Sequence, residues 1–126
     1  YYKKADVWPL NPEGEILVVV MCEEVKAIGN LDEMLKQVPG IGVVLIGEGD
    51  LSQDLGHPRE YDHPIVVEAM AEIRNICAAN NVICGHPHAD MANIDMLVEH
   101  GYQFMVAASS TTTPTLNKAK ELTGRG

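Results

Sequence analysis

The sequence predicts an α/β fold built from four consecutive strand–helix units. Four short apolar runs rich in β-branched residues alternate with segments whose apolar residues recur every three or four positions. Strands that are joined through helices in this way pair in parallel, with right-handed connections. Such a sheet is either a small open doubly wound domain or half of an eight-stranded (β/α)8 barrel, and periodicity does not distinguish the two.

The first unit begins with the run 16–22, "ILVVVMC", which predicts a strand buried on both faces. Residues 24–38 then place apolar side chains at helical spacing, and the sequence "PGIG" ends that helix. The second unit has a strand over 43–47 and a loop that ends in Asp62-His63-Pro64. This tripeptide predicts the start of a helix over 64–81, with proline in its first turn.

The third unit has a strand over 82–85 and a short helix over 89–101, which Gly101 closes. The fourth unit has a strand over 102–109 and a helix over 111–124, with Pro114 near its start. The order of elements is therefore strand then helix, four times over.

The chain carries 18 acidic and 9 basic side chains, a formal net charge of −9 over 126 residues. Nucleic acids and anionic membrane surfaces attract proteins of the opposite charge. The composition therefore argues against both as main partners and suits the binding of cations.

The three cysteines, Cys22, Cys77 and Cys84, lie inside apolar runs without CxxC spacing. This usage predicts buried reduced thiols in place of a disulfide framework, and it favours a cytoplasmic protein. No apolar run approaches the roughly 18 residues of a membrane span. Residues 1–15 lack the architecture of a signal peptide.

Polar residues follow each predicted strand, where α/β folds bind their ligands. They are Glu23 and Glu24 after the first strand, Glu48 and Asp50 after the second, His86 and His88 after the third, and Ser109, Ser110 and Thr111 after the fourth. We therefore expect function at this edge of the sheet.

Glu23 and Asp50 end neighbouring strands and could hold a hard divalent cation through carboxylate oxygens. Such a cation polarises a carbonyl and stabilises an enolate. The alternative is that acids at strand ends only cap helix N-termini. Glu24 and Glu48 are the natural capping residues, and capping explains Glu23 and Asp50 less easily.

Gly47 and Gly49 could let backbone N–H groups approach a carboxylate or phosphate, although a tight turn explains them equally well. His86 and His88 lie in the same predicted loop at the rim of the sheet. They could be metal ligands, acid/base groups or ordinary loop residues.

The remaining histidines have plainer explanations. His57 and His63 are expected in the loop and at the helix start, and His100 suits a helix C-terminus. The sequence holds no P-loop, GxSxG or complete GxGxxG motif.

The stretch "NLDEMLKQVPGIGVVLIGEGDLSQDLGHPREYDHPIVVEAM" resembles the HpcH/HpaI family of class II pyruvate-dependent aldolases. These enzymes act on 2-keto-3-deoxy sugar acids and on 2,4-dihydroxyhept-2-ene-1,7-dioate. Their pattern is a strand ending in a metal-binding Glu, then "NLDEIL", then "GIDGVFIGPADLSxxLGxPxxxxHPxV". The match is specific over about Val18 to Val67 and looser through "HGYQFMVAAS", which is similar to the family's "GxxFVxVG" strand.

The resemblance implies that Glu23 and Asp50 hold a divalent metal, Mg²⁺ or Mn²⁺ with Co²⁺ as a further candidate. It also implies that the Gly49 and Asp50 amides hold the pyruvate carboxylate. The implied activity is a carbon–carbon lyase that cleaves a 4-hydroxy-2-oxo acid to pyruvate and an aldehyde through an enolate. An oxaloacetate-type decarboxylase would use the same enolate, and a non-catalytic cation-binding half-barrel is the alternative from another class.

Family members are closed (β/α)8 barrels whose catalytic His and substrate-binding Arg lie in the first half. Residues 1–126 match the second half, so we expect one partial domain with strands five to eight of a TIM barrel. The main base would then lie outside this chain, with His86 as a local substitute, and the chain alone would be inactive. The family's hexameric assembly implies a homo-oligomer in which the last helix packs on a neighbour.

The chain departs from the family pattern at three residues and in the loop before the second strand, which is one residue longer. Met21 stands where the family has Gln, two residues before the metal-binding Glu, and Glu48 and Gly49 replace Pro and Ala. Loss of the Gln removes a polar group beside the metal, which bears on metal preference and on substrate. The resemblance leaves Glu48 without a role.

Overall fold

The computed structural model describes residues 6–107 and 112–125. Its strands are β1 (Val7–Trp8), β2 (Ile16–Leu17), β3 (Val19–Cys22), β4 (Val43–Ile46), β5 (Ile83–Ala89) and β6 (Phe104–Ala107). Its helices are α1 (Val25–Gln37), α2 (Glu48–Asp54), α3 (Pro64–Ala79), α4 (Ile94–Glu99) and α5 (Thr112–Thr123). The predicted end of the fourth strand and the polar residues after it, 108–111, lie outside the described residues.

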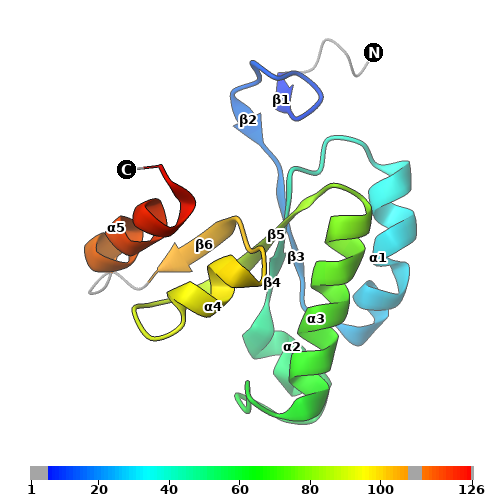
Figure 1. The fold of residues 1–126 in the computed structure, drawn as a ribbon. Helices are drawn as coiled ribbons and strands as arrows, with labels where there is room; N and C mark the ends of the chain where they lie inside the picture. The colour runs from blue at the N-terminus through cyan, green and yellow to red at the C-terminus, as the bar shows by residue number, and fades with distance from the viewer. Residues whose placement is uncertain (1–5, 108–111, 126) are drawn as a thin grey trace.

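Strands β3, β4, β5 and β6 form one parallel sheet in sequence order. The chain returns from each strand to the next through at least one helix (Figure 1). The register pairs Cys22 with Ile46 and Val44 with Cys84. Parallel strands that neighbour one another in sequence order, each followed by a helix, are the arrangement found in a (β/α)8 barrel.

One face of this sheet packs against α1 and α3. The sheet contributes Cys22, Val44, Ile46 and Cys84 to a core with Ile28, Leu31, Leu35, Val66, Met70, Ile73 and Cys77 from the two helices. Each Val, Leu, Ile or Met side chain among them adds roughly 1.5–3 kcal/mol when it is fully buried. The helix-covered face therefore supplies most of the apolar burial of the chain.

The other face of the sheet is open at β3, and the prediction of one strand buried on both faces is wrong. The run 16–22 divides at Val18 into β2 and β3. Its exposed side chains are Ile16 at 52%, Leu17 at 44%, Val19 at 38% and Met21 at 55%. Strand β3 is an edge strand, and no layer within the described residues covers these side chains, so they lack the contacts of a doubly buried strand.

Strands β1 and β2 form a separate parallel pair at the amino end of β4. Their side chains Trp8 and Leu17 lie over Gly42, where an added Cβ would be 2.6 Å from Leu17 Cδ1. This pair therefore closes the end of the sheet opposite the predicted site.

Strand β5 runs to Ala89, so His86 and His88 lie on a strand and not in the predicted rim loop. The register pairs His86 with Met105 and Ala89 with Ala107, with a shift between them. This irregularity lets the strand continue past the expected end, because a bulge tolerates an unpaired residue.

Helix α4 begins at Ile94, later than the predicted start at residue 89. The Asp90 carboxylate accepts hydrogen bonds from the N–H groups of Ala92 and Asn93, at 2.8 and 3.2 Å. Such local side-chain bonds hold the backbone in a turn and delay the helix.

The predicted start of α3 and end of α4 are confirmed. His63 occupies the N-cap position of α3, its Nδ1 accepts from the Ile65 N–H at 3.4 Å, and Pro64 opens the first turn. His100 is the C-cap of α4, and Gly101 follows it with φ of +82°. Glycine adopts that left-handed conformation without strain.

Helix α2 occupies a segment predicted as loop, and it supplies the cap of α1. The Asp54 carboxylate accepts from the Val25 N–H at 2.8 Å. Glu24, at the N-cap position of α1, makes no side-chain cap. The expectation that Glu24 and Glu48 cap helices is therefore wrong, because Asp54 takes the donor of α1 and Glu48 turns toward β5.

The three cysteines are free and buried, as predicted. Burial raises the pKa of Cys22 to about 11, which keeps its thiol protonated. Within the described ranges, no helix has both the length and the apolar character needed to cross a bilayer.

Removing the Asp54 carboxylate should loosen the start of α1. We expect Asp54→Ala in the full-length protein to lower the free energy of unfolding by about 0.5–2 kcal/mol, because the Val25 N–H loses its acceptor. Chemical denaturation measures this change. The control is Gln53→Ala, an exposed neighbour on the same helix, and equal losses in the two variants would contradict the capping role.

Candidate active site

The carboxyl ends of β3 and β4 lie side by side because the two strands pair in parallel. The Gly47 N–H donates to the Cys22 carbonyl at 3.0 Å, which continues the pairing just past the strands. Glu23 follows Cys22 directly, and α2 carries Asp50 in its first turn. The two predicted metal ligands therefore follow the ends of adjacent strands.

Gly47 allows the Glu23 side chain to lie directly over the end of β4. A Cβ at position 47 would be 2.5 Å from Glu23 Oε2 and 2.6 Å from Glu23 Cβ, closer than real contacts of a Cβ. The Met21 methyl carbon would be 3.1 Å away. Only glycine therefore fits at position 47 while Glu23 keeps this place.

These carboxylates form a donor set that fits a hard divalent cation. Glu23 is half-buried and Asp50 is exposed. Within the described residues, 6–107 and 112–125, neither the Glu23 nor the Asp50 side chain has a hydrogen-bond or ion-pair partner. Sites with few carboxylates, completed by water and substrate, are those that Mg²⁺ uses. The assignment of the two ligands stays a prediction.

The first turn of α2 presents backbone amides at the same edge. The first intrahelical hydrogen bond of α2 runs from the Leu51 N–H to the Gly47 carbonyl at 2.9 Å, so the earlier N–H groups of Gly49 and Asp50 have no intrahelical acceptor and are free to donate. The buried Ser52 hydroxyl donates to the Gly49 carbonyl at 2.7 Å and accepts from the Arg59 N–H at 3.0 Å. Ser52, for which the sequence pattern predicts no role, thus fixes Gly49 and links the following loop to it.

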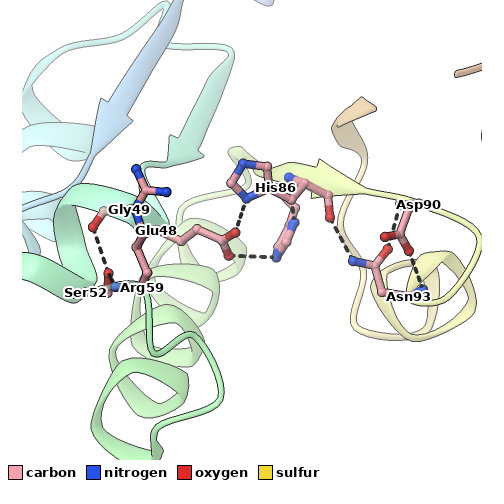
Figure 2. A network of polar contacts seen from close by, with 8 residues as sticks. Glu48, Gly49, Ser52, Arg59, His86, Asp90 and Asn93 are labelled. Carbon is pink, nitrogen blue, oxygen red and sulfur yellow. Dashed lines mark hydrogen bonds and ion pairs between the residues drawn. The ribbon is translucent and has the colours of Figure 1, made fainter. Parts of the chain in front are cut away.

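Glu48 is buried between two histidines of β5 (Figure 2). Its side chain is 5% exposed, its Oε2 lies 3.5 Å from His86 Nε2, and its Oε1 contacts His88 Nδ1. A buried carboxylate is stable only when it is paired and hydrogen-bonded. The two histidines therefore explain a residue that the sequence left without a role.

His86 has both ring nitrogens engaged. Its Nδ1 accepts from the His88 N–H at 3.2 Å, and its Nε2 faces Glu48. The ring also meets Tyr102 edge-on, with centroids 5.2 Å apart. Burial lowers the pKa of His86, and Glu48 opposes that effect only in part, so the ring is neutral at neutral pH.

A cavity of about 620 Å³ adjoins this cluster, with walls from both α3 and α4. Glu48, His86 and His88 line it together with Tyr61, Arg74 and Tyr102. The Arg74 guanidinium lies over the Tyr102 ring, 5.7 Å from its centroid. Cavities of this size accept small organic molecules.

His57, Glu60 and His63 form a separate group in the loop before α3. The rings of His57 and His63 stack, with centroids 3.5 Å apart and planes 17° apart. A histidine binds a metal through a lone pair in the plane of its ring, so two stacked rings do not point at one ion. Both residues therefore keep the loop and helix-start roles that their positions predict.

A model of the family described as HpcH/HpaI aldolase/citrate lyase matches residues 11–115. The chain belongs to this family. The matched residues begin before β2 and end within α5. They therefore include the carboxyl ends of β3, β4 and β5.

Two curated relatives of this HpcH/HpaI chain are aldolases. The chain is 29% identical over 104 residues to 2-dehydro-3,6-dideoxy-6-sulfogluconate aldolase of Pseudomonas putida, covering 82% of this chain and 40% of that protein. It is 34% identical over 98 residues to 2-keto-3-deoxy-L-rhamnonate aldolase of Klebsiella pneumoniae, covering 77% of this chain and 36% of that protein. The chain thus spans about two fifths of the length of these relatives.

A solved HpcH/HpaI aldolase from Desulfitobacterium hafniense has the same fold over this region. It is 30% identical with a TM-score of 0.69, and the match covers 90% of this chain and 46% of that one. Together with the sheet order, this confirms the predicted fold class, four consecutive βα units that make up about half of a (β/α)8 barrel.

A methyl group at position 47 should disturb the site, whereas one at position 29 should not. We expect Gly47→Ala to lower the free energy of unfolding of the full-length protein by about 1–3 kcal/mol, because Glu23 and Met21 must move. Gly29, in the middle of α1, has no atom within 4 Å of an added Cβ. Gly29→Ala should therefore raise stability by about 0.5–1 kcal/mol. Denaturant unfolding measures both, and a tolerated Gly47→Ala would contradict the close approach of Glu23.

Proposed function

We propose that the full-length protein containing this chain cleaves a 4-hydroxy-2-oxo acid, of the 2-keto-3-deoxy type, into pyruvate and an aldehyde. The observation that carries the proposal is the place of Glu23 over Gly47, beside the first turn of α2. Membership of an aldolase family and the similarity to two sugar-acid aldolases support it.

The amides of Gly49 and Asp50 bind the carboxylate of the substrate in this proposal. The Ser52 hydroxyl donates a hydrogen bond to the Gly49 carbonyl, which fixes the orientation of the amides before the substrate binds. Donors fixed in advance cost little reorganisation during the reaction. The start of a helix also favours an anion, because its free N–H groups carry partial positive charge.

Glu23 and Asp50 would hold the divalent cation, Mg²⁺, Mn²⁺ or Co²⁺, which when bound supplies polarisation of the 2-keto group. Gly47 keeps one of the two ligands in place by allowing Glu23 to lie against the backbone. Met21 adds an apolar side chain at this point, where the family pattern has Gln. The protein therefore offers few donors, and water and substrate complete the set.

Proton transfer is predicted to depend mainly on a base outside this chain, with His86 as a local substitute. Because both nitrogens of His86 are engaged, we propose that His86 is not this substitute: it supports Glu48 and does not touch the substrate.

A homo-oligomer, by resemblance a hexamer, is part of the proposal. In the structure, α5 packs against α4 and buries Thr115. Leu116 and Leu122 on the same helix remain 51% and 39% exposed. Apolar side chains left in solvent on the last helix support packing of α5 on a neighbouring subunit.

Loss of either proposed ligand should abolish activity. We expect Glu23→Gln and Asp50→Asn to reduce the rate of pyruvate release by at least about 100-fold, because each removes a charged oxygen donor. EDTA should have the same effect on the wild type, and added Mn²⁺ should restore the rate. Pyruvate is measured with a coupled lactate dehydrogenase assay on 4-hydroxy-2-oxovalerate.

The matched control is Glu24→Gln, which removes the neighbouring exposed carboxylate without touching a described partner. Its rate should stay within about threefold of wild type, as surface changes usually do. Full activity in EDTA, or in both ligand variants, would overturn the metal-dependent mechanism.

A further inference from the structure

A second cavity lies between α5 and the sheet. It has a volume of about 370 Å³, and its walls come mainly from α4, β6 and α5, at the end of the sheet away from β3 (Figure 1). Cavities of roughly 300–1,000 Å³ accept small organic molecules. Glu23, Gly49 and Asp50 do not line it, so it is separate from the proposed active site.

One face of α5 forms a wall of this cavity. Its side chains recur at three- and four-residue spacings, at Thr112, Thr115, Leu116, Ala119, Lys120 and Thr123. A helix that packs on a sheet usually buries a stripe of large apolar residues. Over Thr112–Thr123, however, Thr115 is the one buried residue. The described core therefore does not complete this face of α5.

The Thr115 hydroxyl is buried without a hydrogen-bond partner. The residue is 3% exposed, and its Oγ1 meets no donor or acceptor in the described part of the chain. On the same helix, by contrast, the Thr123 hydroxyl donates to the Ala119 carbonyl at 2.8 Å. A buried polar group that lacks a partner costs free energy. Because Thr115 lines the cavity, a molecule bound there would supply the missing partner.

The charged side chains that line the cavity are basic. Lys120 and Arg125 line it, and no Asp or Glu of the described residues does, although the chain has 18 acidic and 9 basic side chains. Lys118 lies outside the cavity and pairs with Asp95 at 3.7 Å. Within 6–107 and 112–125, neither Lys120 nor Arg125 has an acidic partner for its side chain. Unpaired cations beside a cavity attract an anion.

The other walls are mostly apolar. Ile94 comes from α4, Met105 from β6 and Ala119 from α5. Met105 and Ala119 are half-buried, so each keeps surface that a ligand can cover. Apolar surface that is removed from water stabilises a complex. The cavity therefore suits a ligand with a hydrocarbon body and a negatively charged head group.

We propose that this cavity binds a small organic anion with an apolar body. The Thr115 hydroxyl donates a hydrogen bond to an oxygen of the head group, and Lys120 and Arg125 neutralise its charge. The hydrocarbon part lies against Met105 and Ala119. The site goes beyond the proposed aldolase reaction and does not depend on it.

The first experiment uses sodium hexanoate as the probe and records methionine methyl spectra of the ¹³C-methyl-methionine-labelled full-length protein. Met105 reports this cavity, Met21 reports the proposed active site, and Met96 reports the cavity beside Glu48. We expect hexanoate to shift the Met105 signal to saturation with a Kd of about 1 mM or lower. Hexanol lacks the charge and acetate lacks the body, so each should bind at least about fivefold more weakly.

Two results of this titration would overturn the proposal. A Met105 signal that stays unchanged at about 20 mM hexanoate would mean that water or a neighbouring subunit fills the cavity. A response of Met21 alone would place hexanoate at the proposed carboxylate site. Neither result depends on pyruvate release, so the proposed function stands or fails separately.

The second experiment replaces the hydroxyl by a methyl group of similar size. Thr115→Val should weaken hexanoate binding by about tenfold or more, because the charged head group loses a donor. It should also raise the denaturant midpoint of the unliganded protein, because no unpaired hydroxyl remains buried. A lower midpoint would show that Thr115 already has a partner, and unchanged hexanoate binding would show that it does not contact the ligand. Either result would contradict the proposal.

The charges are tested with the double variant Lys120→Gln/Arg125→Gln and the control Lys118→Gln. The double variant should weaken hexanoate binding by at least about fivefold, because both cations at the cavity are lost. The control removes a charge from the same helix outside the cavity, so its affinity should stay within about twofold of wild type. Equal losses in the two proteins would indicate general attraction to α5, and the assigned site would be wrong.

Discussion

The parallel register between β3 and β4 is the constraint on which the rest of the site depends. Because Cys22 pairs with Ile46, the residues that follow the two strands leave the sheet at the same level. A shift of one residue would turn Glu23 to the opposite face. The close approach of Glu23 to the backbone at Gly47, and the direction in which α2 departs, both follow from this pairing.

Helix α2 owes its place to tertiary contacts. A helix of seven residues has little stability of its own. Asp54 binds it to the start of α1, Ser52 binds it to the loop that follows, and Glu48 binds it to β5. Three contacts to three different parts of the chain therefore hold the turn that presents Gly49 and Asp50.

Local patterns were sufficient for the order of the four sheet strands and of the helices α1, α3, α4 and α5, and for the acids at the strand ends, but they missed α2 and the pair of β1 and β2. Local patterns did not predict contacts between residues that are distant in the sequence. Glu48 contacts His88, 40 residues away, and Asp54 binds the N–H of Val25, 29 residues away. The patterns also ended β5 too early, since His86-Pro87-His88 is unlike a strand, and Pro87 is accommodated by the shift in register. The exposure of β3 depends on what lies beside the sheet, which periodicity does not report.

The open side of β3 has a practical consequence for handling the molecule. Soluble edge strands are usually protected by charges, prolines or bulges, and β3 presents Val19 and Met21 instead. A polypeptide with such an unprotected edge tends to pair with copies of itself, and self-association would compete with folding. Biochemical work on this sequence is therefore better served by conditions that limit self-association, such as low protein concentration.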